Sequence, residues 1–257
     1  MAGRRKGEKL GFAETELDRV RLAACVRLLH MEGLLTYNGH VSVRATPGDR
    51  FLIHSLLDSR AEVSPENLLL LGFDGEVVEA AGARKPPSEY PIHAEIYRAR
   101  GDVGAIAHIH SEYAIAFTLA KDAKVLAMRC DGARWAGGVP VHADPTRIKS
   151  AQQGRALSET LGERDAVLLR AHGAVLAAAG LFEVFMACIH FEENARAQVL
   201  AGRLGQPVPL TEEEIAALEE SWPDAFRSHY AAKIWRYFVH KAVRADLIPE
   251  AWTEKLL

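Results

Sequence analysis

The sequence predicts an α/β fold in which helices cover both faces of a β-sheet. Short apolar runs typical of buried strands, such as 103–107 and 166–169, lie between segments whose apolar residues recur at helical spacing. Strands and helices interleave along the whole chain, which is the pattern expected of an α/β protein. Nearly half of the 257 residues are hydrophobic and a quarter are charged, which indicates an ordinary soluble globular protein.

The first third of the chain supplies one helix and several strands. Apolar residues recur at helical spacing from 15 to 32, and Gly33 follows where a helix terminator is expected. Segment 41–44 alternates apolar and polar residues, and 51–54 is a short apolar run, so both predict strands. Segment 68–78 predicts a hairpin with an Asp-Gly turn.

The rest of the chain continues the alternation. A helix is expected at 89–100, because two prolines block an earlier start and Ser88 can cap it. The further expected elements are a strand at 103–110, helices at 111–120 and 146–161, strands at 166–169 and 173–179, and a long helix at 181–204. Behind the linker 205–210, Thr211-x-x-Glu214 is a capping box that opens another helix.

We expect a disordered basic tail at residues 1–12 and a single domain at 13–257, with a helical C-terminal extension from about residue 211. The tail has no hydrophobic region of signal-peptide length. The extension is rich in aromatic residues, and its segment 235–238 could close over a neighbouring subunit's site. An aromatic stripe at helical spacing is more typical of packing, which is the interpretation we favour.

Charge and composition argue against two classes of partner. The formal net charge is -3, without the basic excess that nucleic-acid binding usually needs, so no nucleic-acid partner is expected. No run approaches the roughly 18 uncharged apolar residues of a membrane span, so no membrane partner is expected. The three cysteines are widely spaced, which predicts free thiols in a reducing compartment and a cytoplasmic protein.

The strongest chemical signal is a His-x-His pair directly after the apolar run 103–107. Side chains alternate faces along a strand, so His108 and His110 point the same way and can share one metal ion. His172 stands at the end of another buried strand, and strand ends of α/β sheets are where sites form. The structural alternatives are hydrogen-bonded histidines for the pair and a turn residue for His172.

Glu89 is the carboxylate candidate. It stands at the expected start of a helix, where its alternative role is to complement the helix dipole. Three imidazoles and one carboxylate form a suitable ligand set for one divalent ion, which is Zn, Mn, Fe or Co. A labile carboxylate would leave positions open on the metal, which suits catalysis better than a structural role.

Four motifs carry a family resemblance: Gly39-His-Val-Ser-Val-Arg44, Pro87-Ser-Glu-Tyr-Pro-Ile-His93, His108-Ile-His110 and Ala171-His-Gly173. From about residue 17 to about residue 214, the chain resembles the class II aldolase and adducin family. The resemblance implies a three-layer α/β/α sandwich around a mixed, largely antiparallel sheet. It also implies a homo-oligomer, commonly a tetramer, with sites at subunit interfaces. By the same resemblance, His108, His110 and His172 are metal ligands, and Glu89 is the acid/base residue that can also coordinate the resting metal.

The chain departs from the family's sugar-phosphate enzymes where those enzymes direct donors at a phosphate. His40 replaces the asparagine of a Gly-Asn-x-Ser loop, and 53–58 replaces a Thr-Gly turn. Pro87 takes one of two small polar positions and leaves Ser88 at the other. Each good hydrogen bond to a charged group contributes roughly 1.5 to 3 kcal/mol, so a phosphosugar is disfavoured. The proton-donating tyrosine of fuculose-type aldolases is also absent, and Arg129 lies in that stretch.

These departures indicate a planar carboxylated substrate. The expected substrate-binding residues are His40, Arg44, His54, Ser88 and Arg129, with Arg134 as a further candidate. A guanidinium fork suits a carboxylate. The chain is most similar to a subgroup with the same Asn-Gly-His-Val-Ser opening, which decarboxylates hydroxylated aromatic dicarboxylates such as dihydroxyphthalate and a hydroxymethylpyridine dicarboxylate. The structural alternatives place Arg44 beside a structural acid, and His54 and Arg134 at the surface.

The expected function is a divalent-metal-dependent carbon-carbon lyase that decarboxylates a hydroxylated aromatic carboxylate. The metal would act as a Lewis acid, and Glu89 or His40 would carry the proton. One alternative is a metal-dependent aldolase on a non-phosphorylated or carboxylated aldol, which needs the same ligands. The other is an adducin-like interaction module without metal ligands, and the three histidines argue against it.

Overall fold

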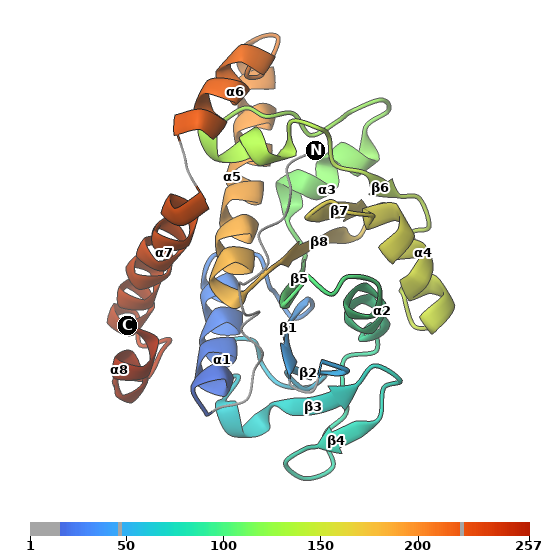
Figure 1. Ribbon diagram of the computed structural model, residues 1–257, viewed down its shortest axis with the longest axis vertical. Helices are drawn as coiled ribbons and strands as arrows, with labels where there is room; N and C mark the ends of the chain where they lie inside the picture. Colours follow the sequence, from blue (N-terminus) through green and yellow to red (C-terminus); the bar gives the residue numbers. More distant parts are fainter. Residues whose placement is uncertain (1–15, 46–47, 222–223) are drawn as a thin grey trace.

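A sheet of eight strands runs through the middle of the molecule (Figure 1). The computed structural model describes residues 16–45, 48–221 and 224–257, so the expected basic tail at 1–12 lies outside the described residues. The strand order is β4-β3-β2-β1-β5-β8-β7-β6. All neighbouring strands are antiparallel except β6 and β7, which are parallel. The mixed, largely antiparallel sheet is therefore confirmed.

The elements follow the expected order along the chain. The strands are β1 (His40–Ala45), β2 (Arg50–Ile53), β3 (Leu69–Gly72), β4 (Val77–Glu79), β5 (Ala105–Ile109), β6 (Val141–His142), β7 (Ala166–Leu169) and β8 (Gly173–Ala178). The helices are α1 (Glu16–Met31), α2 (Pro91–Ala99), α3 (Glu112–Leu119), α4 (Ala151–Leu161), α5 (Leu181–Leu204), α6 (Glu212–Ser221), α7 (Asp224–Arg244) and α8 (Thr253–Leu256). Among the strands of the described residues, only the two-residue β6 has no counterpart in the prediction, because it is too short to leave a periodic pattern.

Helices cover both faces of the sheet. Figure 1 shows α1 and α5 on one side of the strands and α2 and α4 on the other. Each face has its own apolar core, and alternate residues of β5 belong to different cores: Ala107 packs on the α1 and α5 side, whereas Ile106 packs on the α2 and α4 side. This division follows from the alternation of side chains along a strand. The three-layer α/β/α sandwich is confirmed.

Two helices begin later than the sequence predicts. α4 begins at Ala151, because Ser150 and Gln153 form a capping box there, and the residues before it are a loop. α2 begins at Pro91, after an N-cap whose side chain makes no capping bond, so the expected capping role of Ser88 is wrong. Because both helices begin later than expected, the residues before them lie in loops and are free to line the functional site.

The C-terminal segment is helical and packs on α5. Thr211 and Glu214 form the predicted capping box, with backbone-to-side-chain bonds of 2.8 and 3.2 Å. Trp235 of α7 is fully buried against Phe182 and Phe185 of α5, which agrees with the packing interpretation of the aromatic stripe. No helix among the described residues combines the length and apolarity that crossing a membrane requires.

Candidate metal and substrate site

The register of two neighbouring strands brings histidines together at one end of the sheet. β1 pairs with β5 so that His40 lies directly opposite His108. His110 follows the end of β5, and its backbone N–H donates to the carbonyl of Leu34 at 3.0 Å. His172 lies in the short turn between β7 and β8, next to β5 in the sheet. The histidines therefore come from three strand ends.

His108, His110 and His172 form one cluster. Their candidate ligand atoms all lie within 4.8 Å of one another. The ring centroid of His108 lies 4.9 Å from that of His110 and 4.9 Å from that of His172, and the other two centroids are 5.1 Å apart. The structure thus assembles the triad that the sequence predicts.

The hydrogen bonds of His108 prepare it to be a ligand. Its Nδ1 lies 3.2 Å from the carbonyl oxygen of Ala174, and a carbonyl can only accept, so Nδ1 carries the hydrogen. The lone pair is therefore on Nε2, which lies 3.2 Å from Nε2 of His110. Two imidazole nitrogens bound tetrahedrally at about 2.0–2.1 Å from one zinc ion would be about 3.3 Å apart. The residues present fit a divalent metal.

Two glycines allow the strands to approach this closely. A Cβ on Gly173, directly after His172, would lie 2.4 Å from the carbonyl oxygen of Ile109 and 3.2 Å from Cε1 of His108. Gly39, before His40, has φ +85°, and its Cβ would meet the carbonyl oxygen of His108 at 2.9 Å. Only glycine avoids these contacts, so the close approach depends on both positions.

Burial keeps the imidazoles of His108 and His110 neutral. Burial, and then the neighbouring His110 and His172, lower the pKa of His108 well below its usual value. Burial also lowers the pKa of His110 to about 4, and His172 and the positive charge of Arg147 add to the effect. Neutral imidazoles offer the lone pairs that metal binding requires.

Glu89 lies beside the cluster, next to His172. Its Oε2 lies 3.7 Å from Nε2 of His172, and its Oε1 accepts the backbone N–H of Ile148 at 3.2 Å. Glu89 also belongs to a second group of potential ligands with His40 and His108. The backbone bond holds one oxygen and leaves the other directed at the histidines.

A cavity of about 220 Å³ opens beside the cluster. Its wall includes His110, His172, Glu89, His40 and Ser88. It also includes two arginines that sequence reasoning misses, Arg60 and Arg147. No motif marks Arg60, and Arg147 falls in a stretch whose periodicity suggests helix, although it lies in the loop before α4. The cavity therefore combines the histidine cluster with positive charge.

Two arginines expected in the pocket lie elsewhere. Arg44 is buried, and its guanidinium donates to four backbone carbonyls at 2.6 to 2.9 Å, so no fork remains for a substrate. Arg129 lies outside the cavity at the surface, where it pairs with Asp131 and Glu193 at 3.2 and 3.1 Å. Within one chain, neither residue lines the cavity. Arg134 likewise lies outside the cavity and pairs with Asp165.

His54 lies behind the site. It is fully buried, which rules out the surface alternative, and its Nδ1 donates to the carbonyl of Ser55 at 3.1 Å. It does not line the cavity, so the structure does not support direct substrate contact. His40 and Ser88 do line the cavity, as the sequence predicts for substrate-binding residues.

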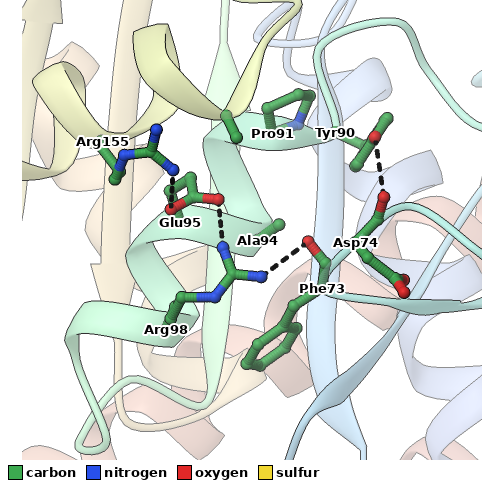
Figure 2. A pocket seen from close by; sticks show the side chains of 9 residues that line it. Phe73, Asp74, Tyr90, Pro91, Ala94, Glu95, Arg98 and Arg155 are labelled. Carbon is green, nitrogen blue, oxygen red and sulfur yellow. Dashed lines mark hydrogen bonds and ion pairs between the residues drawn. The ribbon is translucent and has the colours of Figure 1, made fainter.

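A larger hollow of about 510 Å³ lies away from the histidines, beside α2 and α4 (Figure 2). Figure 2 shows Glu95 between Arg98 and Arg155, and it forms ion pairs with both. Phe73 and Tyr90 line the other side. The two arginines already balance the negative charge of Glu95, and no histidine lines this hollow. The hollow therefore lacks the chemistry of the first cavity.

The comparison with known proteins matches this geometry. A model of the family described as "Class II Aldolase and Adducin N-terminal domain" matches residues 20–199. The chain belongs to the class II aldolase and adducin family. The resemblance that the four motifs carry is therefore confirmed.

The relatives of this family member include decarboxylases and aldolases. It is 31% identical over 249 residues to the 3,4-dihydroxyphthalate decarboxylase of Rhodococcus jostii, which covers 89% of this chain and 98% of the relative. It is 31% identical over 166 residues to a 5-deoxy-D-ribulose 1-phosphate aldolase of Bacillus thuringiensis, which covers 63% of this chain and 74% of the relative. Both reactions are carbon-carbon cleavages, so the relatives support a lyase, and the subgroup expected from the sequence is confirmed.

Solved structures share the fold. The L-fuculose 1-phosphate aldolase of Glaciozyma antarctica superposes with a TM-score of 0.78, over 93% of this chain and 96% of the other. At 23% identity, this likeness shows the common architecture and nothing about the substrate.

Proposed function

We propose that this protein is a divalent-metal-dependent decarboxylase of a hydroxylated aromatic carboxylate, such as a dihydroxyphthalate or a hydroxypyridine dicarboxylate. The observation that carries the proposal is a cavity whose wall holds two of the three clustered imidazoles together with two arginines. The printed activity of the Rhodococcus relative adds support. His108, His110 and His172 would hold the ion, with Glu89 as a further ligand of the resting site.

The two arginines match a carboxylated substrate. Arg60 is held in place because its Nε and Nη1 donate to the carbonyls of Gly39 and Asp58, at 3.1 and 2.6 Å. Arg147 projects from the loop before α4 and is exposed at the cavity. The bonds of Arg60 do not use its Nη2, which can donate to a carboxylate oxygen, and the guanidinium of Arg147 can bind a carboxylate in a bidentate manner. We propose that these two residues orient the substrate carboxylates, the role that the sequence assigned to Arg44 and Arg129.

When bound, the divalent ion would supply a Lewis acid that draws electron density away from the carbon-carbon bond being cleaved. The protein would deliver a proton to the ring carbon that carries the carboxylate. The bond to the carboxylate then breaks, its electron pair restores the aromatic ring, and carbon dioxide leaves. One proton is consumed for each carbon dioxide released. Glu89 and His40 are the candidates to carry this proton, because both line the cavity.

The alternative function is a metal-dependent aldolase on a non-phosphorylated or carboxylated aldol. The aldolase among the relatives favours it, and it would use the same ligands. Product identity separates the two reactions, because an aldolase forms an aldehyde or a ketone and no carbon dioxide. An adducin-like interaction module would need no metal at all.

The test is a substrate screen with purified protein loaded in turn with Zn, Mn, Fe or Co. We expect carbon dioxide from 3,4-dihydroxyphthalate or from a hydroxypyridine dicarboxylate, and none from unsubstituted phthalate, which lacks the hydroxyl. Release of pyruvate or an aldehyde from aldols, without carbon dioxide from any ortho-hydroxy aromatic acid, would replace the proposal by the aldolase. Failure to bind Zn or Mn at micromolar concentration would favour the interaction module.

We also propose a homo-oligomer, and a tetramer in particular, with the site near a subunit interface. Tyr37 and Leu57 are 86% and 89% exposed, and their chain neighbours Asn38 and Leu56 line the cavity. Exposed apolar side chains of this size at a site are typical of an interface. Light scattering during size-exclusion chromatography would give the mass, and a monomer would contradict the proposal. A cytoplasmic location stays a prediction.

A further inference from the structure

Four buried side chains form a hydrogen-bonded chain that ends at the cavity. Nδ1 of His40 lies 2.6 Å from Nε2 of His93, and Nδ1 of His93 lies 2.6 Å from Oγ of Ser42. Oγ of Ser42 lies 2.8 Å from the phenol oxygen of Tyr97. All four side chains are at most 3% exposed. The proposed mechanism uses only the first of them, so the remaining three need another explanation.

This hydrogen-bonded series of four side chains follows from two simple periodicities of the backbone. His40 and Ser42 are two residues apart on β1 and share the face that packs on α2. His93 and Tyr97 are four residues apart on α2 and share one side of that helix. Four polar groups thus meet between a strand and a helix, where an unbonded polar atom would be costly.

The direction of the hydrogen bonds can be deduced from the Tyr97 end. Burial raises the pKa of Tyr97, so the phenol keeps its hydrogen, and Ser42 Oγ is the acceptor found for it among the described residues. The hydroxyl of Ser42 is then free to donate to Nδ1 of His93. Burial lowers the pKa of His93 to about 3, so the ring is neutral and its single hydrogen is on Nε2. That hydrogen is donated to Nδ1 of His40.

Only one position remains for the ring hydrogen of His40. Its Nδ1 accepts the hydrogen of His93 Nε2 at 2.6 Å, so Nδ1 carries no hydrogen of its own. Its one hydrogen is therefore on Nε2, an atom that is buried and has no hydrogen-bond partner among the described residues. The ring lines the cavity beside Glu89 and His108. An N–H without a partner at that place is available to a bound molecule.

We infer that Tyr97, Ser42 and His93 are positioning residues that hold His40 as a fixed N–H donor toward an oxygen of the substrate. The inference excludes His40 as a metal ligand, because an Nε2 that carries hydrogen cannot coordinate a metal. Of the two candidate ligand groups, it therefore favours the one that does not contain His40. It rests on the proposed function only in naming the substrate oxygen. A residue held as a fixed N–H donor does not also carry the proton, so that role is left to Glu89, which lines the same cavity. A neutral imidazole used in this way stabilises charge that develops on a substrate oxygen.

The decisive experiment is a long-range ¹H–¹⁵N correlation spectrum of the full chain with ¹⁵N-labelled histidine rings. The signals of His40 are those that a His40→Asn variant lacks. We expect Nε2 of His40 to have the shift of a protonated nitrogen, and to keep it when Zn alone is added. The lone-pair nitrogens of His108, His110 and His172 should shift on Zn addition. An unprotonated Nε2 on His40, or a His40 signal that moves like a ligand, would overturn the inference whether or not the protein releases carbon dioxide.

Variants of His93 test the positioning. In His93→Gln, the side-chain amide can still donate to Nδ1 of His40, whereas His93→Leu has no donor. We expect His93→Leu to give a mixture of His40 tautomers and a kcat at least about tenfold lower, with the zinc content unchanged. His93→Gln should retain one tautomer and most of the kcat. Equal losses in both variants, with the His40 tautomer unchanged, would mean a merely structural role. Ser42→Ala, which removes the hydroxyl but little volume, gives the same reading if His93→Leu does not fold.

Discussion

His108 faces His110 through their Nε2 atoms, which are 3.2 Å apart, while the Nδ1–H of His108 is held by a backbone carbonyl. This arrangement predicts tight binding of one divalent ion per chain. Loss of an outer-shell partner typically lowers metal affinity by about 10–100-fold, so His172→Ala, which removes a proposed direct ligand, should cost at least about 100-fold. Competition with a chelator, followed by elemental analysis, measures the affinity. His240→Ala, at an exposed histidine, is the control and should bind like the native protein.

Gly173→Ala should disturb both the fold and the site. The new Cβ would lie 2.4 Å from a backbone oxygen of β5, and relief of such a clash typically costs about 1–3 kcal/mol of unfolding free energy. Metal affinity should fall as well, because the same Cβ presses on the His108 ring. Gly101→Ala is the matched control, since a Cβ there meets nothing within 4 Å. Urea unfolding of the two variants compares them, and equal stability would contradict the close approach of the strands.

Arg147→Gln should weaken binding of dicarboxylated substrates. Loss of a charged hydrogen-bond donor costs about 1.5–3 kcal/mol, so KM should rise by roughly 10–100-fold. The effect should be smaller for a substrate with one carboxylate, because fewer groups lose a partner. Arg164→Gln, at an exposed arginine outside the cavity, provides the control. Steady-state kinetics on paired mono- and dicarboxylates give the comparison, and an unchanged KM would remove Arg147 from the proposed site.

Arg44→Lys should destabilise the fold rather than alter substrate binding. The guanidinium donates to four backbone carbonyls from three nitrogens, whereas the lysine ammonium has three N–H groups on one nitrogen and cannot reach them all. Leaving buried acceptors without donors should lower the unfolding free energy by about 2–4 kcal/mol. Chemical denaturation measures this loss. If stability were unchanged while KM rose, the substrate contact expected from the sequence would be reinstated.

Stability should fall in acid because His54 is buried as a neutral ring. Burial, and then the charge of Arg60, lower its pKa to about 3 from an ordinary value of 6.5. Between these two pH values the unfolded chain binds one more proton than the folded chain, so the unfolding free energy decreases as the pH falls. Each such proton contributes a slope of about 1.4 kcal/mol per pH unit. His54→Gln should flatten the measured profile by roughly that amount. A profile with the same slope in His54→Gln would show that His54 does not titrate in this way.

Much of the fold is predictable from local patterns. The long helix α5 has the bounds that the periodicity of 181–204 indicates, and the hairpin of β3 and β4 forms around the expected Asp-Gly turn. The starts of α2 and α4 are less predictable. Proline and a serine cap compete there with apolar periodicity, and the loop residues that result are the ones that reach the cavity.

The candidate site is predictable only in part. The His-x-His pair and His172 belong to motifs at strand ends, and the structure places their rings in one cluster. Arg44 shows the limit of such reasoning. Its place on the strand β1 is predictable, but the four carbonyls that consume its donors come from other segments of the chain.

The sequence by itself determines which side chains share a face of one element, because strand alternation and helical periodicity are local properties of the backbone. It therefore determines that His108 and His110 point the same way. Which faces then meet depends on strand register and helix packing, which join residues distant in the chain. Only the tertiary structure decides that His93 reaches His40, and that Arg147 rather than Arg44 stands at the cavity.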